Sequence, residues 1–241
     1  MTADTGAPGH RSRLGGEVRR AGVVLVPAAV AVWLVMCAVG YLLTHPLEHR
    51  GFTKWEGSAD RFFAAHRTAA WNSVTKIASL VGDTPAIIAV AAVSFVALRV
   101  VTRRWRASVF VLAAMVGEVS IFSSATIVVD RARPTVTHLD GSPPTSSFPS
   151  GHTAAATTMY GLLAIIAVTY AGRTAVRVLA VAVAVVIVVS IGVSRLYRGM
   201  HYPTDVLGGV LLGLLWLTAT TMVVMCGRCR PGACHRGKPE S

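Results

Sequence analysis

Six long apolar runs, separated by short polar segments, dominate the pattern of hydrophobic and polar positions along this chain. They cover roughly residues 21–44, 84–101, 107–129, 152–171, 175–193 and 204–226. Each is close to the ~20 residues that an α-helix needs to cross the hydrocarbon core of a bilayer. The first run has no convincing signal-peptide cleavage site, so we expect it to span as well. The pattern predicts an all-α bundle of six transmembrane helices, forming one domain over residues 21–226.

The segment 45–83 is too polar to cross a membrane. Between residues 59 and 80 its apolar positions recur near helical spacing, and charged side chains occupy much of the remaining surface. This pattern is typical of an amphipathic helix that lies on a membrane surface, and Trp55 and Trp71 suit the level of the lipid headgroups. Such a helix could cap the bundle or form a lip that admits a lipid tail, and the two roles are compatible.

Basic residues predict the orientation of the chain. They are concentrated in residues 1–20, near residues 99–106 and 173–177, and in residues 227–241, all of which share one side of the membrane if there are six spans. Because cytoplasmic segments carry an excess of Lys and Arg, we expect both termini to be cytoplasmic tails, the first of them disordered. The amphipathic helix is then extracytoplasmic, and the protein is a multi-pass protein of the cell (plasma) membrane.

Composition supports the membrane assignment and limits the possible partners. The chain has 241 residues, of which 53% are hydrophobic and 14% charged, against ~25% charged in an ordinary soluble domain. The net charge is +12, but the basic residues flank apolar runs instead of forming one basic face, which argues against nucleic acid as a partner. Cys226, Cys229, Cys234 and His235 resemble a zinc site in spacing. Their short, Arg- and Gly-rich surroundings favour incidental thiols instead.

The segment Pro149-Ser150-Gly151-His152 enters the fourth apolar run. Ser150 is a plausible N-cap, and Gly151 lets the backbone approach a ligand closely. The free N–H groups at the start of a helix form an anion site. His152 would project from this first turn, where it can transfer a proton, although a lone histidine at a membrane boundary is more often only an interfacial polar residue.

A second group of polar residues precedes the sixth run. Pro203 fits the first helical turn, His201 comes just before it, and Asp205 lies four residues after His201. This spacing lets the carboxylate accept the imidazole N–H and leaves the other nitrogen free to attack. Alternatively, Asp205 only complements the helix dipole. Arg133 and Arg195 offer planar forks that match phosphate oxygens, although arginines at a bilayer edge can simply extend to the interface.

These blocks resemble the signature of the type 2 phosphatidic acid phosphatase superfamily, the membrane lipid phosphatases related to vanadium haloperoxidases. That signature is Lys-x6-Arg-Pro, then Pro-Ser-Gly-His, then Ser-Arg-x5-His-x3-Asp, and its second and third blocks match completely at 149–152 and 194–205. The resemblance implies that His201 forms a phosphohistidine, that Asp205 orients it, and that His152 protonates the leaving oxygen and then activates water. It also implies that no metal or other cofactor is needed. The phosphoryl oxygens would be held by Arg133, Arg195, Ser150 and the Gly151 backbone.

The first block departs from the signature, because Thr126 stands where the family has lysine. One cation fewer should weaken phosphate binding or the stabilisation of the transition state. We hypothesise that Arg198 or Arg131 fills the gap, and Arg198 is the stronger candidate because it lies three residues from His201.

Two further acids lie near these blocks. Glu118 falls in the middle of the third run, where an ionisable side chain is costly and often functional. It could pair with a buried arginine or tune a substrate channel. Asp130 is expected to pair with Arg131 or Arg133. Neither acid is assigned to the catalytic set.

The expected function is hydrolysis of a lipid phosphate or pyrophosphate at the outer membrane face. The resemblance suggests polyprenyl (pyro)phosphates, phosphatidylglycerophosphate, phosphatidate or phosphorylated glycolipid precursors, with membrane lipids as the surroundings. An outward-facing site favours a polyprenyl carrier. The alternatives are a non-catalytic lipid-binding or scaffold protein, for which only Thr126 argues, and a phosphoryl transferase that uses the same residues. Six spans make a haloperoxidase unexpected.

Overall fold

The computed structural model describes residues 9–49, 51, 54–103, 105–141 and 144–226, and this part of the chain is helical without strands. The helices are α1 (Gly9–Thr44), α2 (Pro46–His49), α3 (Lys54–Ala65), α4 (Ala69–Val81), α5 (Thr84–Thr102), α6 (Trp105–Val128), α7 (Gly151–Tyr170), α8 (Thr174–Tyr197) and α9 (Pro203–Cys226).

The six predicted spans are confirmed. Six helices are long and apolar enough to cross a membrane, and their bounds differ by a few residues from the expected ones: Gly22–Thr44, Thr84–Thr102, Ala107–Val128, Gly151–Tyr170, Thr174–Tyr197 and Pro203–Val223. The largest difference is in α8, which continues four residues past the expected end at 193. Ser194 and Arg195 therefore belong to the last turns of a helix, which fixes their directions relative to the bundle.

The terminal segments lie largely outside the described residues. α1 begins at Gly9, so residues 9–20, for which we expected disorder, belong to this helix. Residues 1–8 and 227–241 are not described, and the second stretch includes Cys229 and Cys234. The expected thiol cluster therefore falls on a part of the chain about which the structure gives no information.

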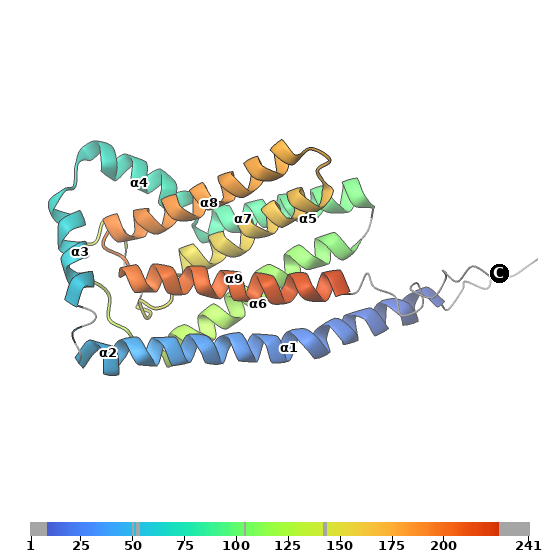
Figure 1. Ribbon diagram of the computed structural model, residues 1–241, viewed down its shortest axis with the longest axis horizontal. Coiled ribbons are helices and arrows are strands. Elements are labelled where there is room, and N and C mark those ends of the chain that lie inside the picture. Colours follow the sequence, from blue (N-terminus) through green and yellow to red (C-terminus); the bar gives the residue numbers. More distant parts are fainter. Residues whose placement is uncertain (1–8, 50, 52–53, 104, 142–143, 227–241) are drawn as a thin grey trace, which may run out of the picture.

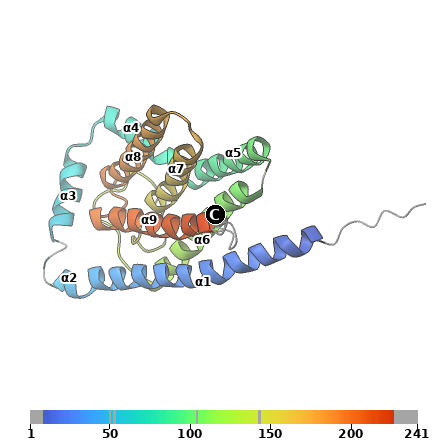
Figure 2. The same ribbon diagram turned by 45° about the vertical axis from the view of Figure 1, so that its right-hand side comes forward.

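α7 and α9 occupy the middle of the bundle. They pack against each other, α7 also packs against α5, α6 and α8, and α1 packs against α6 and α9. Figures 1 and 2 show α1 along one side, α8 along the opposite side and α3 across one end. At that end α7 and α9 begin and α8 ends, whereas α1 begins and α9 ends at the other. All three sequence blocks are thus near the end that α3 covers.

The predicted amphipathic helix is two helices. α4 fits the expectation, because Trp71, Val74 and Ile77 are exposed while its polar Thr75 and Ser79 are buried. The break between α3 and α4 arises at 66–68. There the Arg67 side chain turns inward to donate hydrogen bonds to the carbonyl oxygens of Tyr197 and Thr137, and Thr68 caps α4 by accepting from the Trp71 amide.

The charged face of α3 is directed opposite to our expectation. Glu56 and Asp60 are buried against the bundle, whereas Trp55 and Phe62 are exposed. The outward aromatic side chains of α3 fit a lipid–water interface. Its inward carboxylates fit a buried polar network.

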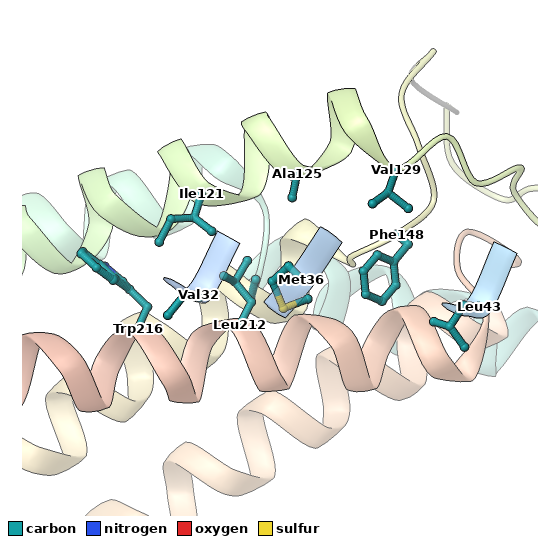
Figure 3. Close-up of a cluster of buried hydrophobic side chains, with 10 residues drawn as sticks. Val32, Met36, Leu43, Ile121, Ala125, Val129, Phe148, Leu212 and Trp216 are labelled. Atoms are coloured by element: carbon teal, nitrogen blue, oxygen red, sulfur yellow. The ribbon is translucent and has the colours of Figure 1, made fainter. Parts of the chain in front are cut away.

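One hydrophobic cluster joins α1, α6 and α9 and also anchors the loop that leads to α7 (Figure 3). Phe148, from this loop, is fully buried there with Met36, Val129 and Leu212. Its ring lies where a Cβ on Gly208 would be, 2.4 Å away, so a larger residue at that position would push the loop out. The hydrophobic core therefore fixes the residues just before Ser150.

The contact between α7 and α9 depends on small residues. A Cβ on Gly209 would lie 2.5 Å from the Ser150 carbonyl oxygen and 3.0 Å from Thr153 Cβ. Because backbone cannot move aside cheaply, we expect Gly209→Ala to destabilise the protein by about 1–3 kcal/mol and to lower activity by separating the two helix starts.

The matched control is Gly22→Ala in α1, where nothing lies within 4 Å of the added Cβ. This change should be neutral or slightly stabilising, because alanine is the better helix former. Thermal unfolding in detergent compares the two variants. Equal unfolding midpoints for them would contradict the proposed close packing.

Candidate active site

The three blocks meet where α7 and α9 begin and α8 ends. The Ser150 amide donates to the Asp205 carbonyl oxygen (2.9 Å), and the Met200 amide donates to the Arg195 carbonyl oxygen (3.0 Å). Gly199 has φ +74°, and a Cβ there would also meet Val136 and the Thr137 carbonyl oxygen. Glycine is therefore required at this left-handed turn, which directs the following residues back over the start of α9.

His201 is buried and held by one ring nitrogen. Its Nδ1 lies 2.8 Å from the Ser147 carbonyl oxygen. Burial, aided by the positive charges of Arg195 and Arg133, lowers the pKa of His201 well below its usual value. A neutral ring must donate from Nδ1 to that carbonyl, because a carbonyl can only accept. We therefore assign the Nδ1-protonated tautomer, which leaves a lone pair on Nε2.

Asp205 lies close to His201, but the structure shows no direct hydrogen bond between them. Its Oδ2 lies 3.9 Å from His201 Nδ1. The same oxygen accepts instead from Ser147 Oγ (2.5 Å) and the Tyr202 amide (2.8 Å), while Oδ1 accepts from Arg131. The carboxylate is thus occupied by closer donors. It acts on the histidine through Ser147, whose hydroxyl it binds and whose carbonyl holds the ring.

Arg133 and Arg195 lie near enough to His201 for their positive charges to act on it. Arg133 donates to the Met200 carbonyl oxygen (2.9 Å), and Arg195 donates to Ser79 Oγ (2.8 Å) and to Asp140 (3.0 Å). Among the described residues, neither buried Nε–H has a hydrogen-bond partner. Unsatisfied buried donors are rare in proteins, and two on guanidinium groups near a nucleophile are suited to bind an anion.

The Ser150–Gly151 step is explained mainly by packing. Ser150 is the N-cap residue, but its hydroxyl pairs with Thr153 Oγ1 (3.1 Å) and makes no cap hydrogen bond. A Cβ on Gly151 would lie 2.7 Å from the Phe122 ring. The glycine is therefore needed for close contact between α6 and α7. We expected a ligand to approach Gly151, but the structure places the Phe122 side chain against it.

His152 has a carboxylate partner that the sequence blocks do not contain. Its Nε2 lies 3.3 Å from Asp83 Oδ1, and the same oxygen accepts from the Thr84 amide as the N-cap of α5. In the sequence, Asp83-Thr84-Pro85 shows only a helix start, so nothing there indicated this contact.

Neither arginine proposed to replace the missing lysine is free to do so. Arg198 makes two hydrogen bonds to Asp140 (2.7 and 2.5 Å) and one to the Leu139 carbonyl oxygen (3.1 Å). Arg131 is occupied by Glu56 and Asp205. Both are buried and their donors are taken up by these partners, so the geometry does not support the hypothesis that one of them fills the gap.

Thr126 and the two further acids are not brought into the site. Thr126 Oγ1 donates to the Ser123 carbonyl oxygen of its own helix (2.8 Å). Arg131 pairs with other acids and Arg133 with backbone, so the expected ion pair of Asp130 with either is absent from the described contacts. Glu118 is buried in α6, and no arginine that the structure describes forms an ion pair with it.

Residues 107–226 match the family model of the PAP2 superfamily. The chain belongs to the PAP2 superfamily. It is 40% identical over 72 residues to phosphatidylglycerophosphatase B of Bacillus subtilis (strain 168), a match that covers 29% of this chain and only about a third (34%) of the relative.

Two solved structures resemble this PAP2 protein in fold. One is a transmembrane PAP2 type phosphatidylglycerolphosphate phosphatase from Bacillus subtilis, with a TM-score of 0.71, 21% identity, and 85% of this chain and 98% of that chain covered. The other is LpxE of Aquifex aeolicus, with a TM-score of 0.51, 20% identity, and 69% of this chain and 92% of that chain covered.

Sequence reasoning missed four acidic or hydroxyl side chains that surround the PAP2 blocks: Glu56, Asp83, Asp140 and Ser147. Each comes from a loop or from the segment 45–83, which we expected to cap the bundle or to form a lip for a lipid tail, and each meets its partner through the tertiary fold. In the described part of the chain, no group of three or more His, Cys, Asp or Glu residues is placed to hold a metal ion.

Asp60 gives a pH-dependent prediction. Burial, with the nearby charges of Glu56 and Asp205, raises the pKa of Asp60 from 3.8 to about 7. At a pH between these two pKa values, Asp60 keeps its proton in the folded protein but has lost it in the unfolded chain. The free energy of unfolding therefore falls as the pH rises from ~4 to ~7. Asp60→Asn removes this cost. Its advantage over wild type should widen by roughly 2 kcal/mol between pH 5 and pH 8.

Unfolding midpoints in detergent at the two pH values measure this difference. Asp130→Asn, at an exposed aspartate, is the control and should show no widening. An Asp60→Asn advantage that is the same at both pH values would contradict the burial of an ionisable carboxyl group there.

Proposed function

We propose that this PAP2 protein is a membrane-embedded phosphatase that hydrolyses a lipid phosphate or pyrophosphate through a phosphohistidine on His201. One observation carries the proposal. A buried histidine, neutral and held at Nδ1 by the Ser147 carbonyl, lies near Arg133 and Arg195, each with an unpaired Nε–H. A nucleophile with a fixed lone pair, beside two guanidinium groups that each keep an unpaired Nε–H, is what displacement at phosphorus requires.

In the first step, His201 Nε2 attacks phosphorus, an N–P bond forms and the P–O bond to the lipid breaks. His152 gives its proton to the departing oxygen, and the Asp83 carboxylate at 3.3 Å stabilises the protonated imidazole beforehand. In the second step, neutral His152 removes a proton from water, and the hydroxide attacks phosphorus. The N–P bond breaks, phosphate leaves, and both histidines regain their starting states.

Two arginines, rather than two arginines and a lysine, would hold the phosphoryl oxygens. The Gly151 amide at the start of α7 would add a donor, since helix starts attract anions, whereas the Ser150 amide is already bound to the Asp205 carbonyl oxygen. We propose that this donor set works without a metal ion.

The location of the site suggests how the substrate arrives. The blocks lie at the end of the bundle away from the start of α1 and the end of α9 (Figure 1). Combined with the excess of basic residues at the other end, this supports cytoplasmic termini and an extracytoplasmic site in the plasma membrane. The exposed aromatic side chains Trp55, Phe62 and Trp71 would seat α3 and α4 among lipid headgroups, next to a phosphate carried on a lipid.

The relatives favour a phosphoglycerolipid as the first substrate to test. Phosphatidylglycerophosphatase B acts, by its name, on phosphatidylglycerophosphate, and the larger structural match is described as a phosphatase of the same class of lipid. Polyprenyl pyrophosphate and phosphatidate remain in the panel, because the site's donors recognise the phosphate and not the tail.

Phosphate release by purified protein tests the proposal. Wild type should release phosphate from at least one lipid of the panel in the presence of EDTA. His201→Ala should lower the rate by ~10³-fold or more, because the nucleophile is lost. His66→Ala is the control, since that exposed histidine bonds only within its own helix region.

Release that stops with EDTA, or that survives in His201→Ala, would contradict the histidine mechanism. Absence of release from every lipid would favour the non-catalytic, lipid-binding alternative.

A further inference from the structure

Glu56 is a buried carboxylate that lies outside all three sequence blocks. It comes from α3 and is fully shielded from solvent. One oxygen accepts from Arg131 Nη2 (2.7 Å), and the other accepts from the Thr204 amide (3.0 Å) and from Thr204 Oγ1 (2.6 Å). Both oxygens are therefore used, and all three bonds reach across to the start of α9 and the loop after α6.

These bonds continue without interruption to the nucleophile. Arg131 binds Glu56 with one terminal nitrogen and Asp205 with the other. Asp205 accepts from Ser147 Oγ, and the Ser147 carbonyl holds His201 Nδ1. The Arg131 carbonyl also accepts from the Ser147 amide (2.8 Å), so the same arginine fixes Ser147 from a second direction.

We propose that Glu56 is a positioning residue for the His201 nucleophile, acting through Arg131, Asp205 and Ser147. The proposal rests on the proposed function, because it assigns a role in that reaction. It means that the PAP2 site is incomplete without α3, a helix outside the matched residues 107–226.

The physical reason lies in the geometry of a buried ion cluster. A guanidinium group between two carboxylates has a single orientation, set by both, and a buried charge that loses its partner is costly. Without the Glu56 carboxylate, one end of Arg131 and the Thr204 amide would lose their acceptor. Arg131 would keep only Asp205 and Thr204 Oγ1 as acceptors, both on Nη1, and its guanidinium group could turn about that end over the Tyr202 ring. The carboxylate that fixes Ser147 would turn with it, and His201 would lose its fixed direction.

A purely structural role for Glu56 is the competing explanation. In that case Glu56 would only fasten α3 to the bundle, and its loss would lower stability without a specific effect on turnover. The two explanations differ in how Glu56 and Arg131 depend on each other. A residue that acts only through Arg131 has no further effect on turnover once Arg131 is gone.

Kinetics of four proteins test this dependence: wild type, Glu56→Gln, Arg131→Met and the double variant. Glutamine keeps the shape of the side chain and removes the charge. We expect Glu56→Gln to lower kcat by roughly 10- to 100-fold with KM changed less than about threefold, because a small misplacement of a reacting group is costly. In the Arg131→Met background the same substitution should leave kcat within about twofold. Effects that multiply, or a change in KM alone, would overturn the proposal.

Ser58→Ala provides the matched control. Ser58 lies on the same helix, is exposed and bonds only within α3, to the Lys54 carbonyl and Arg61. It should leave kcat unchanged, which separates an effect of Glu56 from a general effect of altering α3. A kcat loss in Ser58→Ala equal to that in Glu56→Gln would also overturn the proposal.

A readout without turnover separates this proposal from the proposed function. In protein labelled with ¹⁵N on histidine, the ring signals lost in His201→Ala are those of His201. Wild type should show the Nδ1-protonated tautomer, and Glu56→Gln should show a mixture of tautomers. An unchanged spectrum would overturn the role of Glu56, whatever the activity. Wild type that releases no phosphate, with a spectrum that depends on Glu56, would instead contradict the proposed function alone.

Discussion

The burial of one carboxylate, that of Asp205, is the constraint on which the site depends. It is fully enclosed at the start of α9, where a charge is tolerable only if donors surround it. Arg131, Ser147 and the Tyr202 amide supply those donors. Satisfying the charge thus draws together the two ends of the loop between α6 and α7 and the first turn of α9. The nucleophile is held by a carbonyl that this arrangement places.

The arginines at this end of the bundle divide into two groups with different tasks. Arg131 pairs with the buried carboxylates of Glu56 and Asp205, and Arg198 pairs with the half-buried carboxylate of Asp140, so both stabilise the loops. Arg133 and Arg195 keep a buried Nε–H without a partner among the described residues. Burial lowers the pKa of His201, and the charges of these arginines lower it further. A histidine kept neutral beside cations can attack phosphorus, and the same cations attract the phosphate. In the proposed reaction this positive charge would therefore serve both the nucleophile and the substrate.

The sequence was sufficient for the spans, the helix starts and the convergence of the three blocks, because long apolar runs and fixed motif spacing are local signals. It failed where a side chain had several possible partners. The four-residue spacing suggested that Asp205 binds His201, but a backbone carbonyl from a distant loop is closer. Arg198 was close in sequence to His201, yet it turns to Asp140 from another loop. Asp60 seemed to be on the charged, solvated side of an amphipathic helix, because nothing local shows that α3 turns Asp60 and Glu56 inward.

Detection of the phosphorylated enzyme tests the central claim most directly. The protein would be mixed with a lipid carrying labelled phosphate, stopped within milliseconds in alkaline detergent, and digested. We predict label on the peptide that contains His201, stable to base and released by acid, as a phosphoramidate bond requires, and absent from the His201→Ala variant. Label on a serine or a carboxylate, or turnover without any label on His201 under conditions that preserve such a bond, would contradict the account.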